Sequence, residues 1–204
     1  MHQEILSREQ KQVLPLIKYF YPDFYLAGGT ALALQIGHRK SIDFDLFSPK
    51  EFSNISLRNK IKKNGFEIDK ILFDEQDQFT VLIEKVKITF LFYPFQVTST
   101  SIGEQLRAPS TLTLAAMKAY TLSRRAKWKD YVDLYWITQK YFSLKKVIQE
   151  AQKIFGNEFN EKIFRESLAY FDDIDYSEEV IFAPEWQASE EIIKQSLLQL
   201  AIKK

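Results

Sequence analysis

The sequence has no cysteine and, among its 204 residues, two histidines, His2 and His38. Without cysteine, disulfide bonds, thiolate zinc sites and a cysteine nucleophile are excluded. Two histidines are too few for multi-histidine metal sites and for most histidine-based catalytic triads. Any chemistry must therefore use carboxylates, lysine, arginine, hydroxyl groups or backbone amides.

Long apolar runs and targeting signals are missing as well. No apolar stretch approaches the ~18 residues that a membrane-spanning helix needs. Residues 1–4 lack the basic residues and the following apolar stretch of a secretory signal peptide. Glycine and proline, six of each, are scattered rather than gathered in a linker. We therefore expect a cytoplasmic protein with no part in a membrane.

Neither sign of charge predominates, since 28 Lys and Arg against 27 Asp and Glu give a net charge of +1. This total excludes a uniformly basic nucleic-acid coat, but it conceals two charged segments. Residues 107–129 hold six basic residues and no acidic ones, whereas residues 172–191 hold eight acidic residues and no basic ones. Apolar residues make up 46% of the chain, which is enough to bury a core and excludes wholesale disorder.

The first half of the chain mixes helix and strand patterns. Ser7 and Gln10 form a capping-box pattern for a short helix that Pro15 kinks or ends. Further on, strands are predicted at residues 24–27 and 42–47, helices at 30–36 and 53–63, and three strands within 66–95, separated by turn signals at 74–77 and 84–85.

After residue 110 the helical period predominates. The predicted helices cover residues 113–124, 128–142, 144–155, 160–171 and 190–202. Mixed elements followed by helices favour an α+β fold. We predict a mixed β-sheet with flanking helices over residues 1–109 and a helical bundle over residues 110–204.

Two aspartates, Asp43 and Asp45, lie two residues apart in a predicted strand. Residues at this spacing point to the same face of a strand, so Ile42 and Phe44 are expected to face the core. Adjacent carboxylates repel unless a cation lies between them, and a pair of hard oxygen ligands suits Mg²⁺ or Mn²⁺. The alternative is a polar edge of the strand that faces water.

Gly28, Gly29 and Thr30 join a predicted strand to a predicted helix. Glycines at such a junction let a phosphate approach the backbone, and the helix start offers free N–H groups. Thr30 can add a hydroxyl group. The alternative is an ordinary tight turn, but a phosphate cradle beside a carboxylate pair is what the binding of a nucleoside triphosphate requires.

These residues resemble the signature of the DNA polymerase β-type nucleotidyltransferases, and more narrowly of the AbiEii/AbiGii toxin family. The resemblance covers roughly residues 24–136. The residues that carry it are Leu26-Ala27-Gly28-Gly29-Thr30-Ala31-Leu32, Arg39-x-Ser41-x-Asp43-x-Asp45-Leu46, Leu114-Ala115-Ala116-Met117-Lys118-Ala119-Tyr120, Arg124-Arg125 and Lys129-Asp130-Tyr131-Val132-Asp133-Leu134-Tyr135.

The resemblance implies a nucleotidyltransferase-like fold, an NTP substrate and a metal held by Asp43 and Asp45. It implies that Lys118 and Asp130 are needed for activity, with Asp133 as a further candidate. It also makes Arg39 and Ser41, which precede the Asp pair, phosphate-binding or strand-positioning residues. Beyond the site, it implies a toxin with a cognate antitoxin, and RNA, including tRNA ends, as the acceptor.

The basic segment supports two interpretations. Lys118, inside an apolar helical run, either points at a triphosphate or extends to solvent from the helix edge. The basic residues of 124–129 either contact RNA phosphates or form a solvated turn. The acidic segment 172–191 is interpreted as a solvated loop, or as a surface that repels or mimics nucleic acid. His38 is expected in a surface loop, and Trp128, Trp136 and Trp186 are expected to be packing residues rather than platforms for base stacking.

One feature departs from the superfamily pattern. Many members carry a third catalytic carboxylate on a later strand, and the corresponding residue here is Thr89, with Lys87, Thr89 and Leu91 on one face of the strand. Glu84 is a candidate substitute. The missing acid leaves two hypotheses open: an active enzyme with weaker assistance or one metal ion, or a degenerate protein that binds a nucleotide or a partner without turnover.

Overall fold

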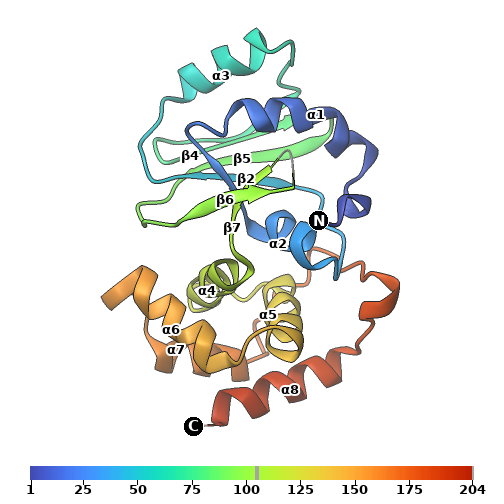
Figure 1. Cartoon of the computed structure of the whole chain (residues 1–204), viewed down its shortest axis with the longest axis vertical. Helices are drawn as coiled ribbons and strands as arrows, with labels where there is room; N and C mark the ends of the chain where they lie inside the picture. Colours follow the sequence, from blue (N-terminus) through green and yellow to red (C-terminus); the bar gives the residue numbers. More distant parts are fainter. Residues whose placement is uncertain (104–105, 204) are drawn as a thin grey trace. The chain divides into compact units, whose positions relative to one another are not determined.

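The computed structural model describes residues 1–103 and 106–203. It divides into two compact units, residues 1–110 and 111–204, which are described separately (Figure 1). In the described part of the chain, no helix is long and apolar enough to cross a membrane.

The first unit is built on a mixed sheet that has five strands among the described residues, in the order β1-β2-β5-β4-β3. The strands are β1 (Tyr25–Ala27), β2 (Phe44–Ser48), β3 (Lys70–Asp74), β4 (Gln78–Ile83) and β5 (Val86–Phe92). The β2 and β5 strands are parallel, and the other neighbouring pairs are antiparallel. The predicted α+β class is therefore confirmed.

Helices α1 (Arg8–Tyr19), α2 (Gly28–Ile36) and α3 (Asn54–Lys63) accompany this sheet, and a short 3₁₀ turn, η1 (Gln3–Ile5), precedes them (Figure 1). A separate hairpin of β6 (Ser99–Ile102) and β7 (Leu106–Pro109) follows. The sequence analysis missed this hairpin because its first strand is Ser-Thr-Ser-Ile, which lacks apolar alternation.

Aromatic packing forms the core beneath the sheet. The ring of Phe20 lies 4.8 Å from that of Phe90, and Phe24 lies 5.3 Å from Phe90. In β5, Ile88 and Phe90 are buried, whereas Lys87 and Thr89 are partly exposed, as the predicted alternation requires. One face of β5 therefore belongs to the core and leaves the other for a site.

Local signals in the first unit mostly act as predicted. The Ser7 and Gln10 capping box is present, but α1 continues through Pro15 to Tyr19. Residues beyond the proline are buried, including Ile17 at 0% exposure, so their packing outweighs the hydrogen bond that proline removes. At the turn between β4 and β5, Glu84 and Lys85 both have positive φ angles, which is typical of a two-residue hairpin.

The second unit is helical in its described part. Its helices are α4 (Thr111–Leu122), α5 (Trp128–Lys140), α6 (Leu144–Phe155), α7 (Glu161–Ala169) and α8 (Glu190–Ile202), with 3₁₀ turns η2 (Gly156–Glu158) and η3 (Pro184–Trp186). Side chains of Ser143, Asn160 and Ser189 cap the starts of α6, α7 and α8. Residues 128–137 of α5 are nearly all buried, so this helix forms the centre of the unit. Trp128 and Trp136 are buried, and the partly exposed Trp186 packs its ring 5.1 Å from that of Trp136, as expected of packing residues.

Candidate functional site

Asp45 lies on β2 between two strands of the sheet. Its backbone is in register with Ala27 on β1 and with Thr89 on β5. Its carboxylate lies against Gly28, because a Cβ atom built on Gly28 would fall 2.1 Å from Asp45 Oδ2. The carboxylate is therefore placed at the N-terminus of α2, where the helix dipole favours negative charge.

Asp43 lies just before β2 and is also tied to the start of α2. The Thr30 hydroxyl donates a short hydrogen bond to the backbone carbonyl of Asp43 and lies 2.9 Å from Ser41 Oγ. Asp43 Oδ2 lies 2.7 Å from Nζ of Lys87, and both side chains are partly exposed. The strand begins at Phe44, which leaves Ile42 61% exposed, so the prediction that Ile42 faces the core is wrong.

The two glycines make room for side chains of the chain itself. Gly28 has a φ angle of +66°, which L-residues rarely adopt. At Gly29, a Cβ atom would meet Arg39 Nη2 at 2.7 Å and Ser41 Oγ at 3.1 Å. The absence of a Cβ atom at Gly28 and Gly29 therefore lets Asp45, Arg39 and Ser41 pack against the start of α2. Binding of phosphate to the two glycine amides stays a proposal.

Three side chains of the loop before β2, those of His38, Arg39 and Ser41, are buried. Arg39 is 1% exposed and donates from Nη1 to the carbonyl of Lys40 at 2.9 Å, and Ser41 is 8% exposed. His38 is 0% exposed, so the expectation of a surface histidine is wrong. Arg39, Ser41 and Thr30 are placed to hold the backbone that carries Asp43.

The donor set fits a divalent cation that is shared with a substrate. Asp43 and Asp45 offer hard oxygen ligands, and no group of three or more His, Cys, Asp or Glu residues within 1–103 and 106–203 is arranged to hold a metal ion. Mg²⁺ commonly takes one or two carboxylates and completes its shell with water and substrate phosphates. A metal here would therefore depend on the nucleotide for its remaining ligands.

In the second unit, Lys118 on α4 lies between two carboxylates of α5. Its Nζ atom is 2.5 Å from Asp130 Oδ1 and 2.8 Å from Asp133 Oδ2, and all three side chains are at most 9% exposed. Lys118 therefore does not extend to solvent. Arg125 Nε lies 3.5 Å from Asp130 Oδ2, which brings a second cation to the cluster.

Three more basic residues of the segment, Arg124, Lys127 and Lys129, have partners within the second unit. Nζ of Lys127 and Nζ of Lys129 lie 2.5 and 2.8 Å from the two carboxylate oxygens of Glu178, which belongs to the acidic segment. Arg124 lies over the ring of Tyr120, at 3.6 Å from its centroid. Burial alone would raise the pKa of Glu178, but the hydrogen bonds and charges of the two lysines outweigh it and lower the pKa to about 2.

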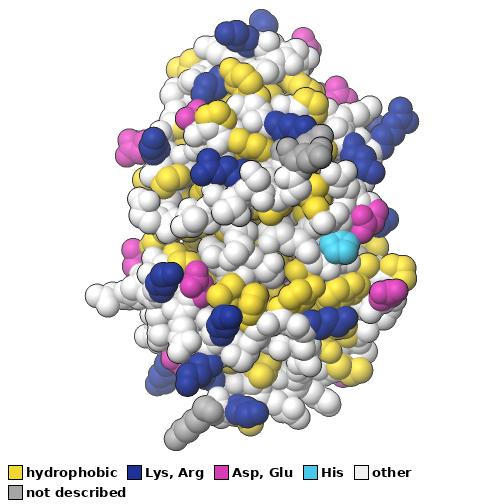
Figure 2. Space-filling model, viewed as in Figure 1, with side chains coloured by type: hydrophobic (Ala, Val, Ile, Leu, Met, Phe, Trp, Pro, Cys, Tyr) yellow, Lys and Arg dark blue, Asp and Glu magenta, His cyan; other side chains and the backbone are white. Residues whose placement is uncertain are grey.

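Sequence reasoning thus found both groups of candidate residues, each within its own unit. It missed the contact of Lys87 with Asp43, although the alternation of β5 had placed Lys87 on the open face. It also missed Glu178, since no local signal in an acidic run shows which carboxylate pairs with a distant lysine. On the face drawn in Figure 2, Lys and Arg side chains are spread widely rather than gathered in one stripe.

Comparison with known proteins decides the family. A family model described as "Nucleotidyl transferase AbiEii toxin, Type IV TA system" matches residues 18–199. The chain belongs to this AbiEii family. The match includes the helices after residue 136, which the sequence motifs did not reach.

One curated sequence and two solved structures are similar to this AbiEii chain. An uncharacterized protein, aq_aa25, from Aquifex aeolicus (strain VF5) is 30% identical over 94% of this chain and 96% of its own length. MenT4, a nucleotidyltransferase toxin from Mycobacterium tuberculosis H37Rv, matches with a TM-score of 0.60 and 15% identity, over 95% of this chain and 81% of its own. JHP933 from Helicobacter pylori gives a TM-score of 0.60 and 17% identity, over 96% and 91%.

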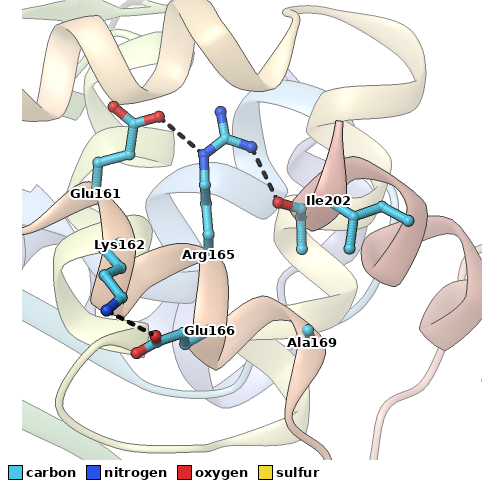
Figure 3. A pocket seen from close by; sticks show the side chains of 7 residues that line it. Glu161, Lys162, Arg165, Glu166, Ala169 and Ile202 are labelled. Atoms are coloured by element: carbon cyan, nitrogen blue, oxygen red, sulfur yellow. Dashed lines mark hydrogen bonds and ion pairs between the residues drawn. The ribbon is translucent and has the colours of Figure 1, made fainter. Parts of the chain in front are cut away.

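A pocket in the second unit lies between α7 and the end of α8, and none of the candidate site residues lines it (Figure 3). Arg165 pairs with Glu161 at 2.8 Å and donates to carbonyls at the end of α8, and Lys162 pairs with Glu166 at 3.8 Å. Arg165 thus joins α7 to the end of α8, whereas the pairs of Glu161 with Arg165 and of Lys162 with Glu166 lie within α7.

Proposed function

We propose that this AbiEii-family chain transfers a nucleoside monophosphate from an NTP to an acceptor hydroxyl group. The observation that carries the proposal is the placement of Asp43 and Asp45 at the first turn of α2, where Gly28 and Thr30 hold them. Mg²⁺ or Mn²⁺, bound by both aspartates and the triphosphate, would supply charge stabilisation at the α-phosphate. The acceptor hydroxyl group would release its proton to solvent and its oxygen would attack in line, the bond from the α-phosphate to the bridging oxygen would break, and pyrophosphate would leave.

The residues around the aspartates act mainly by positioning. Thr30, Ser41 and Arg39 keep the loop before β2 against α2, and the amides of Gly28 and Gly29 would bind phosphate at the helix start. In the second unit, Lys118 stays a proposed phosphate-binding residue, and Asp130 would hold its ammonium group in place. Asp133, which also contacts Lys118, joins Asp130 in this role.

Family membership supports an acceptor and a partner as further proposals. We propose RNA, including tRNA ends, as the acceptor and a cognate antitoxin as the protein partner. Lys127 and Lys129 are candidates for RNA contact, but RNA would have to compete with Glu178 for them. Because both lysines already pair with Glu178, we expect them to bind RNA more weakly than lysines that are open to solvent.

A second function is favoured by one observation. Thr89, in register with Asp45, supplies a hydroxyl group where a third carboxylate is expected. A protein without that base could bind a nucleotide and Mg²⁺ without turnover. Calorimetry combined with an assay for product separates the two functions. A degenerate protein would bind an NTP in the presence of Mg²⁺ in calorimetry and yet form no product in the assay.

The decisive assay incubates the protein with each labelled NTP, Mg²⁺ and total RNA, tRNA or protein fractions. Asp43→Asn keeps the shape of the side chain and removes its charge, and Asp77→Asn, at the exposed turn between β3 and β4, is the matched control. The proposal predicts that label is transferred by the parent and by Asp77→Asn and is lost in Asp43→Asn. No transfer to any acceptor by the parent would overturn it.

A further inference from the structure

Lys87 lies on the same face of the sheet as the two aspartates. The register pairs Asp45 with Thr89, and Lys87 precedes Thr89 by two residues on the same side of β5. Its Nζ atom lies 2.7 Å from Asp43 Oδ2, and the side chains of Lys87 and Asp43 are 36% and 23% exposed. The pair therefore lies at the open face of the site, where it can meet a substrate.

The other groups at this place on β5 and β4 are neutral. Thr89 is in register with Asp45 on one side and with Thr80 on the other, and the two threonine hydroxyls lie 3.4 Å apart. The two carboxylates are accompanied by two cations of the chain, the ammonium group of Lys87 and the buried guanidinium group of Arg39 beside Gly29, so the four formal charges sum to zero. One divalent cation brings this sum to +2, which suits a polyanionic triphosphate, whereas a second would bring it to +4 without a third carboxylate to hold it.

We propose that Lys87 is a positioning residue that substitutes for a second metal ion: it holds Asp43 in place and leaves a site for one divalent cation. The inference rests on the proposed function, since it concerns the metal that this function requires. Because the ammonium group competes with metal for Asp43, the free protein binds a divalent cation weakly, and cation and triphosphate bind together.

The test measures Mn²⁺ binding directly, by electron paramagnetic resonance and calorimetry, so that it does not depend on turnover. The variants are Lys87→Gln, Lys87→Arg, and Lys70→Gln as a control on the exposed edge strand β3. Without nucleotide, Lys87→Gln should bind Mn²⁺ about tenfold more tightly than the parent, because a competing charge is gone. Lys87→Arg and Lys70→Gln should stay near the parent value.

Two further measurements complete the test. Addition of Asp43→Asn to Lys87→Gln should abolish the tighter binding of Mn²⁺. With an α,β-methylene NTP, the parent should bind one Mn²⁺ per chain. The inference is overturned if Lys87→Gln binds Mn²⁺ no more tightly than the parent, or if the parent binds two Mn²⁺ with the analogue. If the Lys87 effect is found but no labelled NTP is ever transferred, the proposed function fails while the inference about Lys87 stands.

Discussion

The ammonium group of Lys118 lies 2.5 Å from Asp130 Oδ1, and the side chains of both residues are buried in the helical unit. Asp133 contacts the same ammonium from the next turn of α5, at 2.8 Å. Removal of one member of a buried ion pair leaves an uncompensated charge, which costs more than the pair contributes. The cluster therefore fixes α4 against α5 and presets the orientation of Lys118.

We predict that Lys118→Met destabilises the protein by about 3–5 kcal/mol, because two buried carboxylates would lose the ammonium group that they share, although Arg125 stays near Asp130. Urea denaturation followed by circular dichroism measures the loss. Lys118→Met combined with Asp130→Asn and Asp133→Asn should recover much of it. A loss below 1 kcal/mol for Lys118→Met alone would contradict the ion cluster.

The contact between Glu178 and the two lysines predicts a dependence of stability on pH. Because the folded-state pKa of Glu178 is about 2 and its ordinary value is 4.5, its stabilisation is fully present above pH 4.5 and is lost as the pH falls towards 2. The Glu178 side chain is 33% exposed, so solvent screening reduces the effect to about 1 kcal/mol.

To measure it, the free energy of unfolding of the parent and of Glu178→Gln is compared at pH 7 and pH 3. At pH 7 the parent should be more stable than Glu178→Gln, and this difference in the free energy of unfolding should be smaller at pH 3. Glu179→Gln, an exposed neighbour, serves as the control and should show no such change. A difference that is the same at both pH values would argue against a charged Glu178 in this contact.

Glycine substitutions separate backbone strain from displacement of Asp45. Gly28→Ala adds strain at a φ angle of +66° and a clash with Asp45 Oδ2, whereas Gly65→Ala adds strain at +80° with no atom within 4 Å. Both should lose about 1 kcal/mol of stability from strain. Gly28→Ala alone should also weaken Mg²⁺-dependent NTP binding, by about tenfold or more, in calorimetry. Equal NTP affinity in the two variants would contradict the placement of Asp45 against α2.

Thr30→Val tests the hydroxyl that holds the Asp43 backbone. The change keeps the side-chain volume but removes the donor to the Asp43 carbonyl, in a residue that is 1% exposed. We expect a loss of about 1 kcal/mol of stability and a fall in kcat with little change in KM, because Thr30 acts through Asp43. Thr30→Ser should restore both, and a raised KM with an unchanged kcat would instead indicate direct contact with the nucleotide.

Local patterns in the sequence were sufficient to predict most of the elements. The predicted helix at 144–155 coincides with α6, and that at 190–202 coincides with α8, because serine caps and an apolar stripe mark both. The hairpin of β6 and β7 was missed, since both strands are short and β6 is polar. The burial of His38 could not be predicted either, because a loop residue is buried by distant segments that a local pattern does not show.

For the candidate site, the sequence predicted the residues that lie close together along the chain but not their partners from distant segments. Spacing placed Asp43 and Asp45 together, and one helix face brought Asp130 and Asp133 together. The partners that decide their electrostatics, Lys87 and Lys118, come from other strands and helices. The register of the sheet is set by the whole fold. It places the neutral Thr89, rather than a third carboxylate, beside Asp45.

The most direct test of the account is the transfer of label from an NTP to an acceptor in the presence of Mg²⁺, measured for the parent and for Asp45→Asn. Asp45 is held against Gly28 and in register with Thr89, so its loss should remove the metal site without disturbing the sheet. The account predicts transfer that requires Mg²⁺ and falls by at least about a hundredfold in Asp45→Asn. Transfer at the parent rate in Asp45→Asn would contradict it.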